Sequence, residues 1–394
     1  MNAPPNRLGE FFDTYTRDLK ADDLQRLFTR DTAEAYRFFT RHVDADALKG
    51  LPWHIRAASY TRAVFMAFTM KLSPARRVVF ASALVLALIG LLNLLRGIGF
   101  IEVAAFPIVG GVGIPGPIFH QGTWPLLFAF ALMNLLVLLE VADRLSLKND
   151  LEIARDIQQA MLPSGLYDAP GVETVGFSRP ANTVGGDFYD ILPLDDGRVV
   201  VTVGDVAGKG SPAALLMALL LAMLRTLVDE RLEAAELVAR LNVQVARHAP
   251  PSRFITLFYA VFDPRTGELT YVNAGHTAPL LLRNDGSIER LTAGGIALGM
   301  FAQSTYETGH ATIQPNELVA TYSDGITEAE NPKGQPFDES GLESTLTAHR
   351  DLEISAVGSA VVRAVELYTA DTRLADDLTI LLLRRRTVAT AVGV

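Results

Sequence analysis

The spacing of apolar residues divides the chain into a membrane-like half and a half with the pattern of a compact domain. Two apolar runs of 18 residues, Val78–Leu95 and Trp124–Val141, contain a single charge between them, Glu140. A helix of about 20 residues crosses the roughly 30 Å of hydrocarbon in a bilayer. The runs therefore predict two transmembrane helices within residues 76–142, joined by an apolar extracytoplasmic loop.

Basic residues indicate the orientation of this region, because Lys and Arg concentrate on the cytoplasmic side of membrane proteins. They flank the two runs on their outer sides, whereas residues 97–123 contain neither Lys nor Arg. The flanking residues are Lys71, Arg76 and Arg77, then Arg144 and Lys148, and Arg96 is the one dissenting charge. The polar start of the chain shows no signal-peptide pattern. We expect a multi-pass protein of the inner (cytoplasmic) membrane with a cytoplasmic N-terminus and C-terminal domain.

The segments on either side of the membrane region are predicted to be helical. Residues 1–75 mix charges with aromatic and Leu positions at the spacing of short amphipathic helices. Residues 143–164 form a linker whose apolar positions recur at alternating intervals of four and three. These positions are Leu147, Leu151, Ala154, Gln158 and Met161. Such a seam favours a homodimer through residues 143–163, and packing of the helix on its own domain is the alternative.

Residues 165–386 show the pattern of one α+β domain, followed by a short tail at 387–394. Strand-like runs lie at 172–177, 198–204, 254–263, 269–273, 279–283, 317–323 and 377–383. Helical runs lie at 212–230, 234–248, 339–349 and 354–370. Short turns between successive strands predict antiparallel pairing. We expect two antiparallel sheets flanked by helices.

Composition narrows the chemistry of this domain. The formal net charge is −9, and the 394 residues include no Cys. An acidic protein is a poor general nucleic-acid binder, because such binding needs basic side chains that neutralise phosphates. The absence of Cys excludes disulfides, thiolate zinc sites and a cysteine nucleophile.

Four acidic motifs lie beside the predicted strands and indicate a shared site. They are GGDFYD (185–190), GDVAGKG (204–210), YSDGITE (322–328) and ADDLT (375–379). Several carboxylates share a buried site only when cations neutralise their repulsion. Oxygen ligands favour Mg²⁺ or Mn²⁺ over zinc, and two such ions about 3.5–4 Å apart can activate water and bind a phosphoryl group.

The ordered motifs resemble those of a known family. The four acidic motifs, together with ARDIQQAMLP (154–163) and NAGH (273–276), are similar to the motifs of PPM (type 2C) metal-dependent protein serine/threonine phosphatases. The similarity is to the SpoIIE/RsbU branch and covers about residues 150–386. It implies an α-β-β-α sandwich of two antiparallel sheets that holds two Mn²⁺ or Mg²⁺ ions.

The resemblance also implies roles for individual residues. The implied metal ligands are Asp187, Asp205, the Val206 carbonyl, Asp324 and Asp376, with Asp377 as the alternative to Asp376. Asp205 would bridge both ions, and it and Asp187 are the catalytic candidates. Further candidates, behind the ligands or at the substrate, are Asp190, Gly186, Gly208, Lys209, Arg179 and His276. For His276 a structural role in its loop is favoured.

Two departures from the family pattern concern the leaving group and the phosphate. Many eukaryotic members carry a His, proposed as a proton donor, two residues after the bridging Asp, and Ala207 stands there in this chain. Their phosphate-binding Arg has no secure counterpart, and Arg179 is the candidate.

The resemblance implies hydrolysis of phosphoserine or phosphothreonine on a partner protein. The expected partner is a STAS-type anti-sigma-factor antagonist in partner-switching signalling. One alternative is a catalytically degenerate domain that binds a partner or senses metal. A remote alternative is a diguanylate cyclase, whose GGDEF signature resembles GGDFYD but needs an acidic residue where this chain has Phe188.

Overall fold

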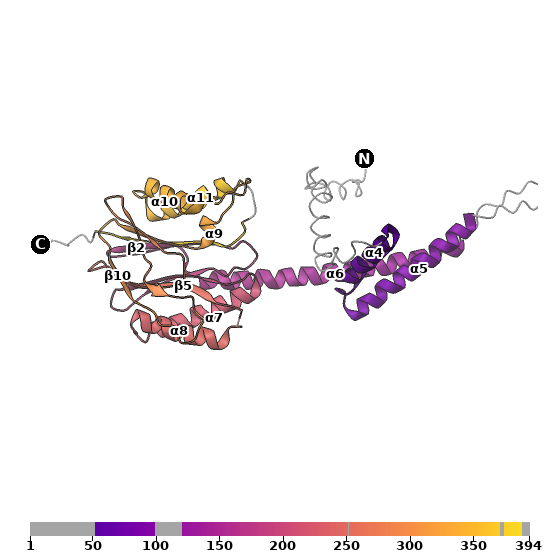
Figure 1. The fold of residues 1–394 in the computed structure, drawn as a ribbon, viewed down its shortest axis with the longest axis horizontal. Coiled ribbons are helices and arrows are strands. Elements are labelled where there is room, and N and C mark those ends of the chain that lie inside the picture. Colours follow the sequence, from indigo (N-terminus) through magenta and orange to yellow (C-terminus); the bar gives the residue numbers. More distant parts are fainter. Residues whose placement is uncertain (1–51, 99–119, 251, 371–373, 388–394) are drawn as a thin grey trace, which may run out of the picture. The chain divides into compact units, whose positions relative to one another are not determined.

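The computed structural model describes residues 52–98, 120–250, 252–370 and 374–387. The chain separates into two compact units, residues 1–145 and 146–394 (Figure 1). Most of the predicted N-terminal helical region and of the apolar loop lies outside the described residues.

Helices α4 (Trp53–Thr69), α5 (Pro74–Ile98) and the start of α6 (His120–Met161) make up the described part of the first unit. The first predicted membrane run lies within α5 and the second within α6. Both helices are long and apolar enough to cross a membrane. Large apolar side chains such as Leu88 and Phe130 are exposed on them, as expected of helices whose apolar surface faces lipid.

Helix α6 continues without interruption from the second apolar run through the predicted linker to Met161. Its 42 residues correspond to a length of about 60 Å at 1.5 Å per residue. The predicted boundary near residue 142 is therefore a change of composition within one helix.

The second unit contains two sheets. Sheet A has the order β1-β2-β12-β11-β7-β8, and sheet B has the order β10-β6-β5-β4-β3, with β9 beside β6. The strands of sheet A are β1 (Leu166–Ala169), β2 (Val172–Arg179), β7 (Leu280–Leu282), β8 (Ile288–Arg290), β11 (Leu318–Tyr322) and β12 (Leu378–Arg385). Those of sheet B are β3 (Phe188–Pro193), β4 (Val199–Val206), β5 (Ile255–Asp263), β6 (Glu268–Ala274), β9 (Gly294–Gly295) and β10 (Gly309–Thr312).

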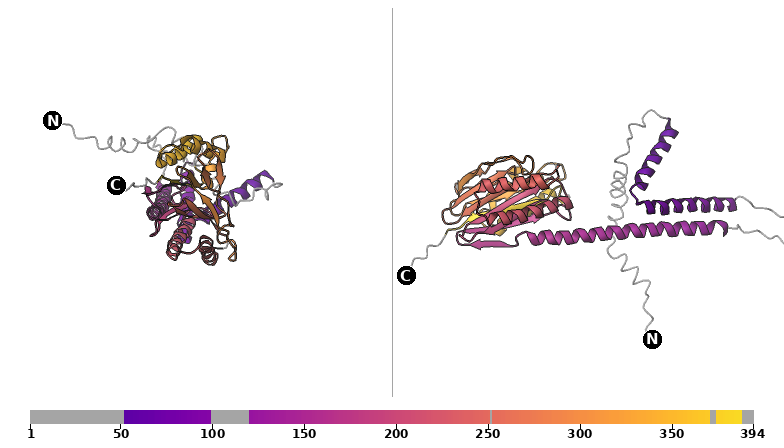
Figure 2. Two further views of the ribbon diagram at one scale, coloured as in Figure 1. Left: turned by 90° about the vertical axis from the view of Figure 1, so that its left-hand side faces the viewer. Right: turned by 90° about the horizontal axis from the view of Figure 1, so that it is seen from below.

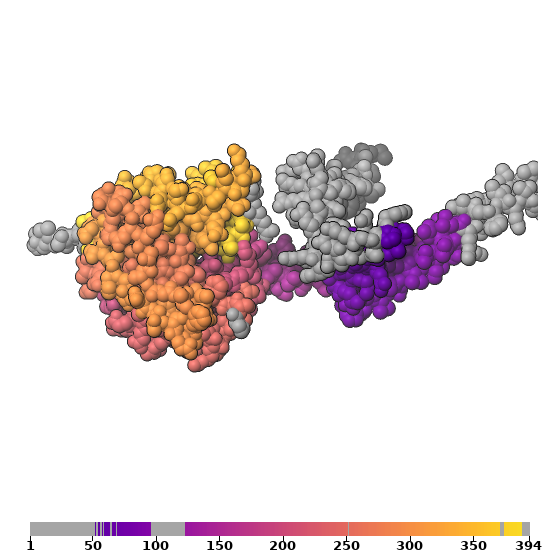
Figure 3. Space-filling view, viewed as in Figure 1, coloured from indigo at the N-terminus to yellow at the C-terminus, as the bar shows by residue number. Residues whose placement is uncertain are grey.

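Helices cover the outer face of each sheet. Sheet B contacts α7 (Ser211–Val228) and α8 (Ala234–His248), and sheet A contacts α9 (Asp324–Thr327) and α11 (Ile354–Thr369). Helix α10 (Asp338–His349) packs beside α9 and α11. The two helical layers lie on opposite sides of the strands in Figure 1 and in the left view of Figure 2, and they form opposite outer surfaces of the unit in the space-filling view (Figure 3). The predicted α+β class with two antiparallel sheets is confirmed, and only the two-residue β9 pairs in parallel.

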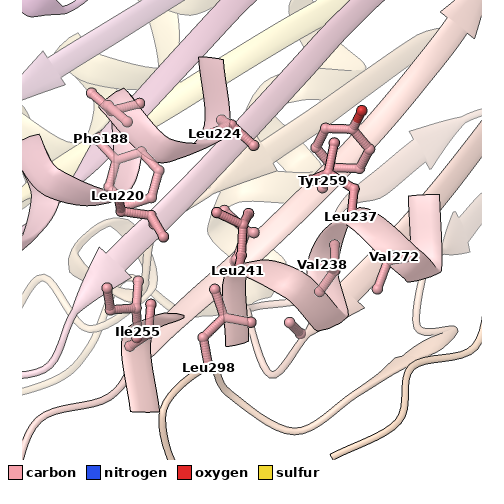
Figure 4. Close-up of a cluster of buried hydrophobic side chains, with 14 of the residues drawn as sticks. Phe188, Leu220, Leu224, Leu237, Val238, Leu241, Ile255, Tyr259, Val272 and Leu298 are labelled. Atoms are coloured by element: carbon pink, nitrogen blue, oxygen red, sulfur yellow. The ribbon is translucent and has the colours of Figure 1, made fainter. Parts of the chain in front are cut away.

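Three apolar clusters hold these layers together. One lies between sheet B and its helices and includes Phe188, Leu220 and Leu241 (Figure 4). A second fills the space between the sheets, where Val203 and Leu381 are buried. The third lies between sheet A and α9–α11.

Helix α7 is apolar enough to pass for a third membrane span, but its packing assigns it to the domain. Six of its residues are buried, and Met217 and Leu224 belong to the cluster on sheet B.

Candidate metal centre

The four acidic motifs meet at one end of the sandwich because of strand pairing. In sheet B the start of β3 pairs with the end of β4, through Phe188 and Gly204. In sheet A the end of β11 pairs with the start of β12, through Tyr322 and Ile380. Each motif lies at one of these four strand ends, so segments up to 190 residues apart in the chain converge.

Strand alternation directs Asp205 into the space between the sheets. Side chains two residues apart on a strand share a face, and Val203 and Val201 belong to the cluster between the sheets. Asp205 continues this row at the end of β4. Asp187, directly before β3, is buried at 4% exposure.

The paired glycines of GGDFYD are explained by close approach from both sheets. A Cβ on Gly185 would lie 2.4 Å from the Asp377 Oδ2 atom. A Cβ on Gly186 would lie 2.9 Å from the Val206 carbonyl oxygen and 3.0 Å from Asp205 Oδ1. Any larger residue would therefore push the two sheets' acidic groups apart.

Burial and mutual repulsion raise the pKa values of the central aspartates. Burial, followed by the charge of Asp205, holds the pKa of Asp187 well above its usual range. Burial, then the charges of Asp324 and Asp376, raises the pKa of Asp205 to about 6. Loss of water, then Glu328 and Asp376, raises the pKa of Asp324. Each raised pKa reflects a carboxylate that is partly withdrawn from water and lies close to other negative charges.

The donor set fits hard divalent cations. Among the described residues, Asp187 Oδ2 is a buried carboxylate oxygen with no hydrogen-bond partner. Such an atom beside Asp205 and the Val206 carbonyl matches the all-oxygen ligation of Mg²⁺ or Mn²⁺. As the side chains stand, no three acidic or His residues in the described part of the chain already surround one point. Asp376 contributes to this, because its Oδ2 atom lies 2.8 Å from Lys209 Nζ.

The adjacent aspartates Asp376 and Asp377 have different partners. Asp377 is buried, and its carboxylate accepts hydrogen bonds from the backbone amides of Ala181 at 2.7 Å and Gly186 at 2.6 Å. Its oxygens are thus directed at the loop before β3. The Asp376 side chain is 40% exposed; its Oδ1 atom accepts from the Asp377 backbone amide at 2.9 Å, and its Oδ2 atom pairs with the exposed ammonium group of Lys209. Of the two, Asp376 has the carboxylate that is available to a cation.

Three basic residues lie near the motifs. Lys209 is paired with Asp376, and Arg179, at the end of β2, is paired with Glu366 of α11. Arg253 is the residue that motif reasoning missed. Its guanidinium donates a hydrogen bond to the Ala207 carbonyl and occupies the space that a Cβ on Gly208 would need.

The predicted candidate Asp190 serves the other face of sheet B. Its Oδ2 atom accepts a hydrogen bond from Arg225 Nε of α7 at 2.7 Å, and the carboxylate is 1% exposed. Arg225 also donates to the Met161 carbonyl, at the end of α6, at 2.6 Å. Asp190 therefore anchors α6 and α7, and its side chain does not face the other aspartates.

His276 lies in the turn that NAGH forms. Its backbone amide donates to Asn273 Oδ1 at 2.8 Å, and its Nδ1 atom lies 2.9 Å from Thr256 Oγ1. Thr256 pairs with Asp205 in the sheet, so His276 contacts the cross-strand neighbour of Asp205. Burial lowers the pKa of His276 to about 4, although the nearby Tyr322 backbone acts against the shift, so the ring is neutral at pH 7.

Comparisons with known proteins agree with this arrangement. Residues 195–386 match the family model described as Stage II sporulation protein E (SpoIIE). The chain is 32% identical over 241 residues to Protein IcfG of Synechocystis sp., covering 54% of this chain and 38% of that protein. It is 27% identical to Phosphoserine phosphatase RsbU of Bacillus subtilis, covering 61% of this chain and 71% of RsbU.

A solved structure supports the fold. The SiaA-PP2C domain of Pseudomonas aeruginosa superposes with a TM-score of 0.54 at 20% identity, covering 62% of this chain and 98% of that domain. The chain spans 38% of the length of IcfG and 71% of that of RsbU. The motif order, the sandwich and the match over residues 195–386 agree, and this unit resembles the SpoIIE/RsbU branch of the PPM phosphatases.

Proposed function

We propose that the second unit is a metal-dependent phosphatase that hydrolyses phosphoserine or phosphothreonine on a partner protein. The observation that carries the proposal is the buried Asp187 beside the partly buried Asp205: both pKa values are raised, and the Asp187 Oδ2 atom has no partner among the described residues. A domain that only bound proteins would gain nothing from this uncompensated charge, which destabilises the fold.

The residues divide the work as follows. Asp187, Asp205 and the Val206 carbonyl would hold one of two Mn²⁺ or Mg²⁺ ions, and Asp205 would share the second with Asp324 and Asp376. When bound, such ions supply a hydrolytic nucleophile at neutral pH and neutralise charge on the phosphoryl oxygens. Asp377 keeps the loop before β3 in place through the Gly186 amide.

The substrate phosphate is expected to meet Arg253. Among the described residues, Lys209 and Arg179 are paired with acidic side chains, whereas Arg253 contacts the Ala207 carbonyl beside the proposed ligands. A guanidinium can bind phosphate through two parallel hydrogen bonds. Replacing Arg253 with Ala should raise KM for a phosphoprotein more than it lowers kcat.

We further propose that the substrate is a phosphorylated STAS-type antagonist and that the protein acts at the membrane. The name of the relative RsbU, phosphoserine phosphatase, supports a phosphoserine substrate. Helices α5 and α6 would cross the membrane with both ends of the chain cytoplasmic. Arg76 supports this assignment. It lies just before the first apolar run and pairs with Glu140 at 3.2 Å and Asp143 at 2.7 Å, at the end of the second run.

The linker is proposed to form a homodimer through its exposed part. Of the predicted seam, Leu147 is exposed and Leu151 and Ala154 are half-buried on α6, whereas Gln158 and Met161 pack on the chain's own domain. The predicted seam is thus divided, and its N-terminal part, from Leu147 to Ala154, is the part that would meet a second copy.

The decisive experiment is a dephosphorylation assay on the full chain in lipid nanodiscs. Phosphorylated STAS proteins from the same genome serve as substrates, with Mn²⁺, with Mg²⁺ and with chelator. We expect metal-dependent phosphate release that Asp205→Asn abolishes. Binding of a STAS protein without phosphate release from any substrate would favour the degenerate alternative.

A further inference from the structure

The last turns of α6 are attached to the motif that contains Asp187. The Gln158 side chain is buried and makes a two-way contact with the backbone of Gly185. Its Nε2 atom donates to the Gly185 carbonyl at 2.8 Å, and its Oε1 atom accepts from the Gly185 amide at 3.1 Å. The Gln158 side chain thus binds both backbone polar groups of Gly185, which lies two residues before the proposed ligand Asp187.

The segment from Gly185 to Asp187 is held from two sides. On one side Gln158 binds Gly185, and on the other the Asp377 carboxylate accepts from the Gly186 amide at 2.6 Å and more loosely from the Asp187 amide at 3.4 Å. The two glycines contribute no side chain to pack and have wide conformational freedom. The position of the Asp187 carboxylate therefore depends on these two clamps.

Two later residues of GGDFYD, Tyr189 and Asp190, also hold the end of α6 through hydrogen bonds. Tyr189 donates from its hydroxyl to the Pro163 carbonyl at 2.7 Å. Asp190 orients Arg225, which donates to the Met161 carbonyl at 2.6 Å. Every polar residue of GGDFYD except Asp187 thus contacts α6, its end or a residue that binds that end.

We propose that Gln158 is a positioning residue for metal binding, which sets the place of the Asp187 carboxylate through Gly185. This inference rests on the proposed function, because it assigns Asp187 to a cation. An amide is the side chain suited to the task, since it donates and accepts at once. It also follows that the last turn of α6 is part of the catalytic domain, so a rotation of α6 at this level breaks the pair and displaces Asp187.

The test compares two neighbouring glutamines in the full chain. Gln158→Leu removes both hydrogen bonds at similar volume, and Gln158→Glu keeps only the acceptor. Gln159→Leu is the matched control, because Gln159 is exposed on the same turn. Mn²⁺ affinity is measured by calorimetry, and backbone exchange of the peptide spanning residues 185–190 is measured by hydrogen–deuterium mass spectrometry without metal.

We expect Gln158→Leu to weaken Mn²⁺ binding at least tenfold and to speed exchange in this peptide, with kcat largely restored at saturating Mn²⁺. Gln158→Glu should fall between it and the wild type, and Gln159→Leu should match the wild type. Unchanged exchange in Gln158→Leu, or equal effects at both glutamines, would overturn the inference. The exchange experiment needs neither metal nor substrate, so it gives its answer even if the wild type hydrolyses no phosphoprotein.

Discussion

The two sheets contribute carboxylates to the same end of the sandwich, but under different conditions. On the sheet B side, Asp187 is buried and Asp205 is partly buried, and burial is the chief cause of their raised pKa values, as it is for Asp324 on the other side. On the sheet A side, Asp324 is exposed, Asp376 is half-exposed beside a Lys, and Asp377 is occupied by backbone amides. The sheet B side thus holds confined negative charge that no cation among the described residues compensates, whereas the sheet A side is accessible or already satisfied.

This difference teaches which interactions a cation would change. On the sheet B side, a divalent ion would relieve repulsion that no side chain relieves among the described residues. On the sheet A side, it would displace Lys209 from Asp376, which costs less because exposed ion pairs contribute only about 0–1 kcal/mol. We therefore expect substitutions on the sheet B side to have the larger effects on metal affinity and catalysis.

The largest effect is expected for Asp205→Asn. The amide keeps the size of the side chain but removes the charge that the proposal assigns to both ions. Phosphate release should fall by at least about 10³-fold, since charge stabilisation of this kind is a dominant catalytic term. The metal-free variant should be at least as stable as the wild type, because a buried charge has been removed. Full activity in Asp205→Asn would remove this residue from the mechanism.

Adjacent aspartates on sheet A give the next contrast. Asp377→Ala leaves the buried amides of Ala181 and Gly186 without their acceptor, so the free energy of unfolding should fall by about 2–4 kcal/mol. Asp376→Ala should leave stability within about 0.5 kcal/mol but weaken Mn²⁺ binding. Urea denaturation and calorimetry on the two variants separate these effects. Equal stability losses would contradict the division of roles between the two residues.

How far the sequence predicted this site depends on the kind of signal. Three of the four motifs were located because their Asp adjoins a strongly apolar predicted strand, and strand pairing then brings all four together. Residues 188–193 were not predicted as a strand, because Gly-Gly and Asp residues in the motif are typical of turns. Their strand character comes from pairing with β4, which is a tertiary effect.

Other features have no local signal at all. The choice between Asp376 and Asp377 depends on which carboxylate faces the amides of a loop almost 200 residues earlier in the chain. Gln158 fits a heptad seam, and the pattern alone does not reveal that its partner is Gly185 of the same chain. Arg253 precedes a strand in no recognisable motif, and only the strand pairing between β4 and β5 brings it to Gly208.

The raised pKa of Asp205 predicts how pH acts on the sheet B side. Its value of about 6 in the fold exceeds the ordinary 3.8, so the folded state holds a proton that the unfolded state loses in this interval. The contribution of Asp205 to the stability of the metal-free protein is therefore greatest below about pH 4 and falls by about 2–3 kcal/mol as the pH rises to 6. Thermal unfolding in chelator, followed by circular dichroism from pH 4 to 7, measures this decline, and Asp205→Asn should flatten it. A metal-free protein that gains stability over the same interval would contradict the assigned shift.

The smallest effect is expected for Lys209→Met, on the sheet A side. Removing the ammonium group frees Asp376 for a cation, which should tighten Mn²⁺ binding, but it also removes a positive charge that moderates the raised pKa of Asp324. Because the ion pair is half-exposed, the net change should be no more than about threefold. Mn²⁺ titrations at low and high salt measure it, and the difference from the wild type should shrink as salt screens the pair. A loss of activity as large as that of Asp205→Asn would instead place Lys209 at the substrate, and the two sides of the site would then be equally essential.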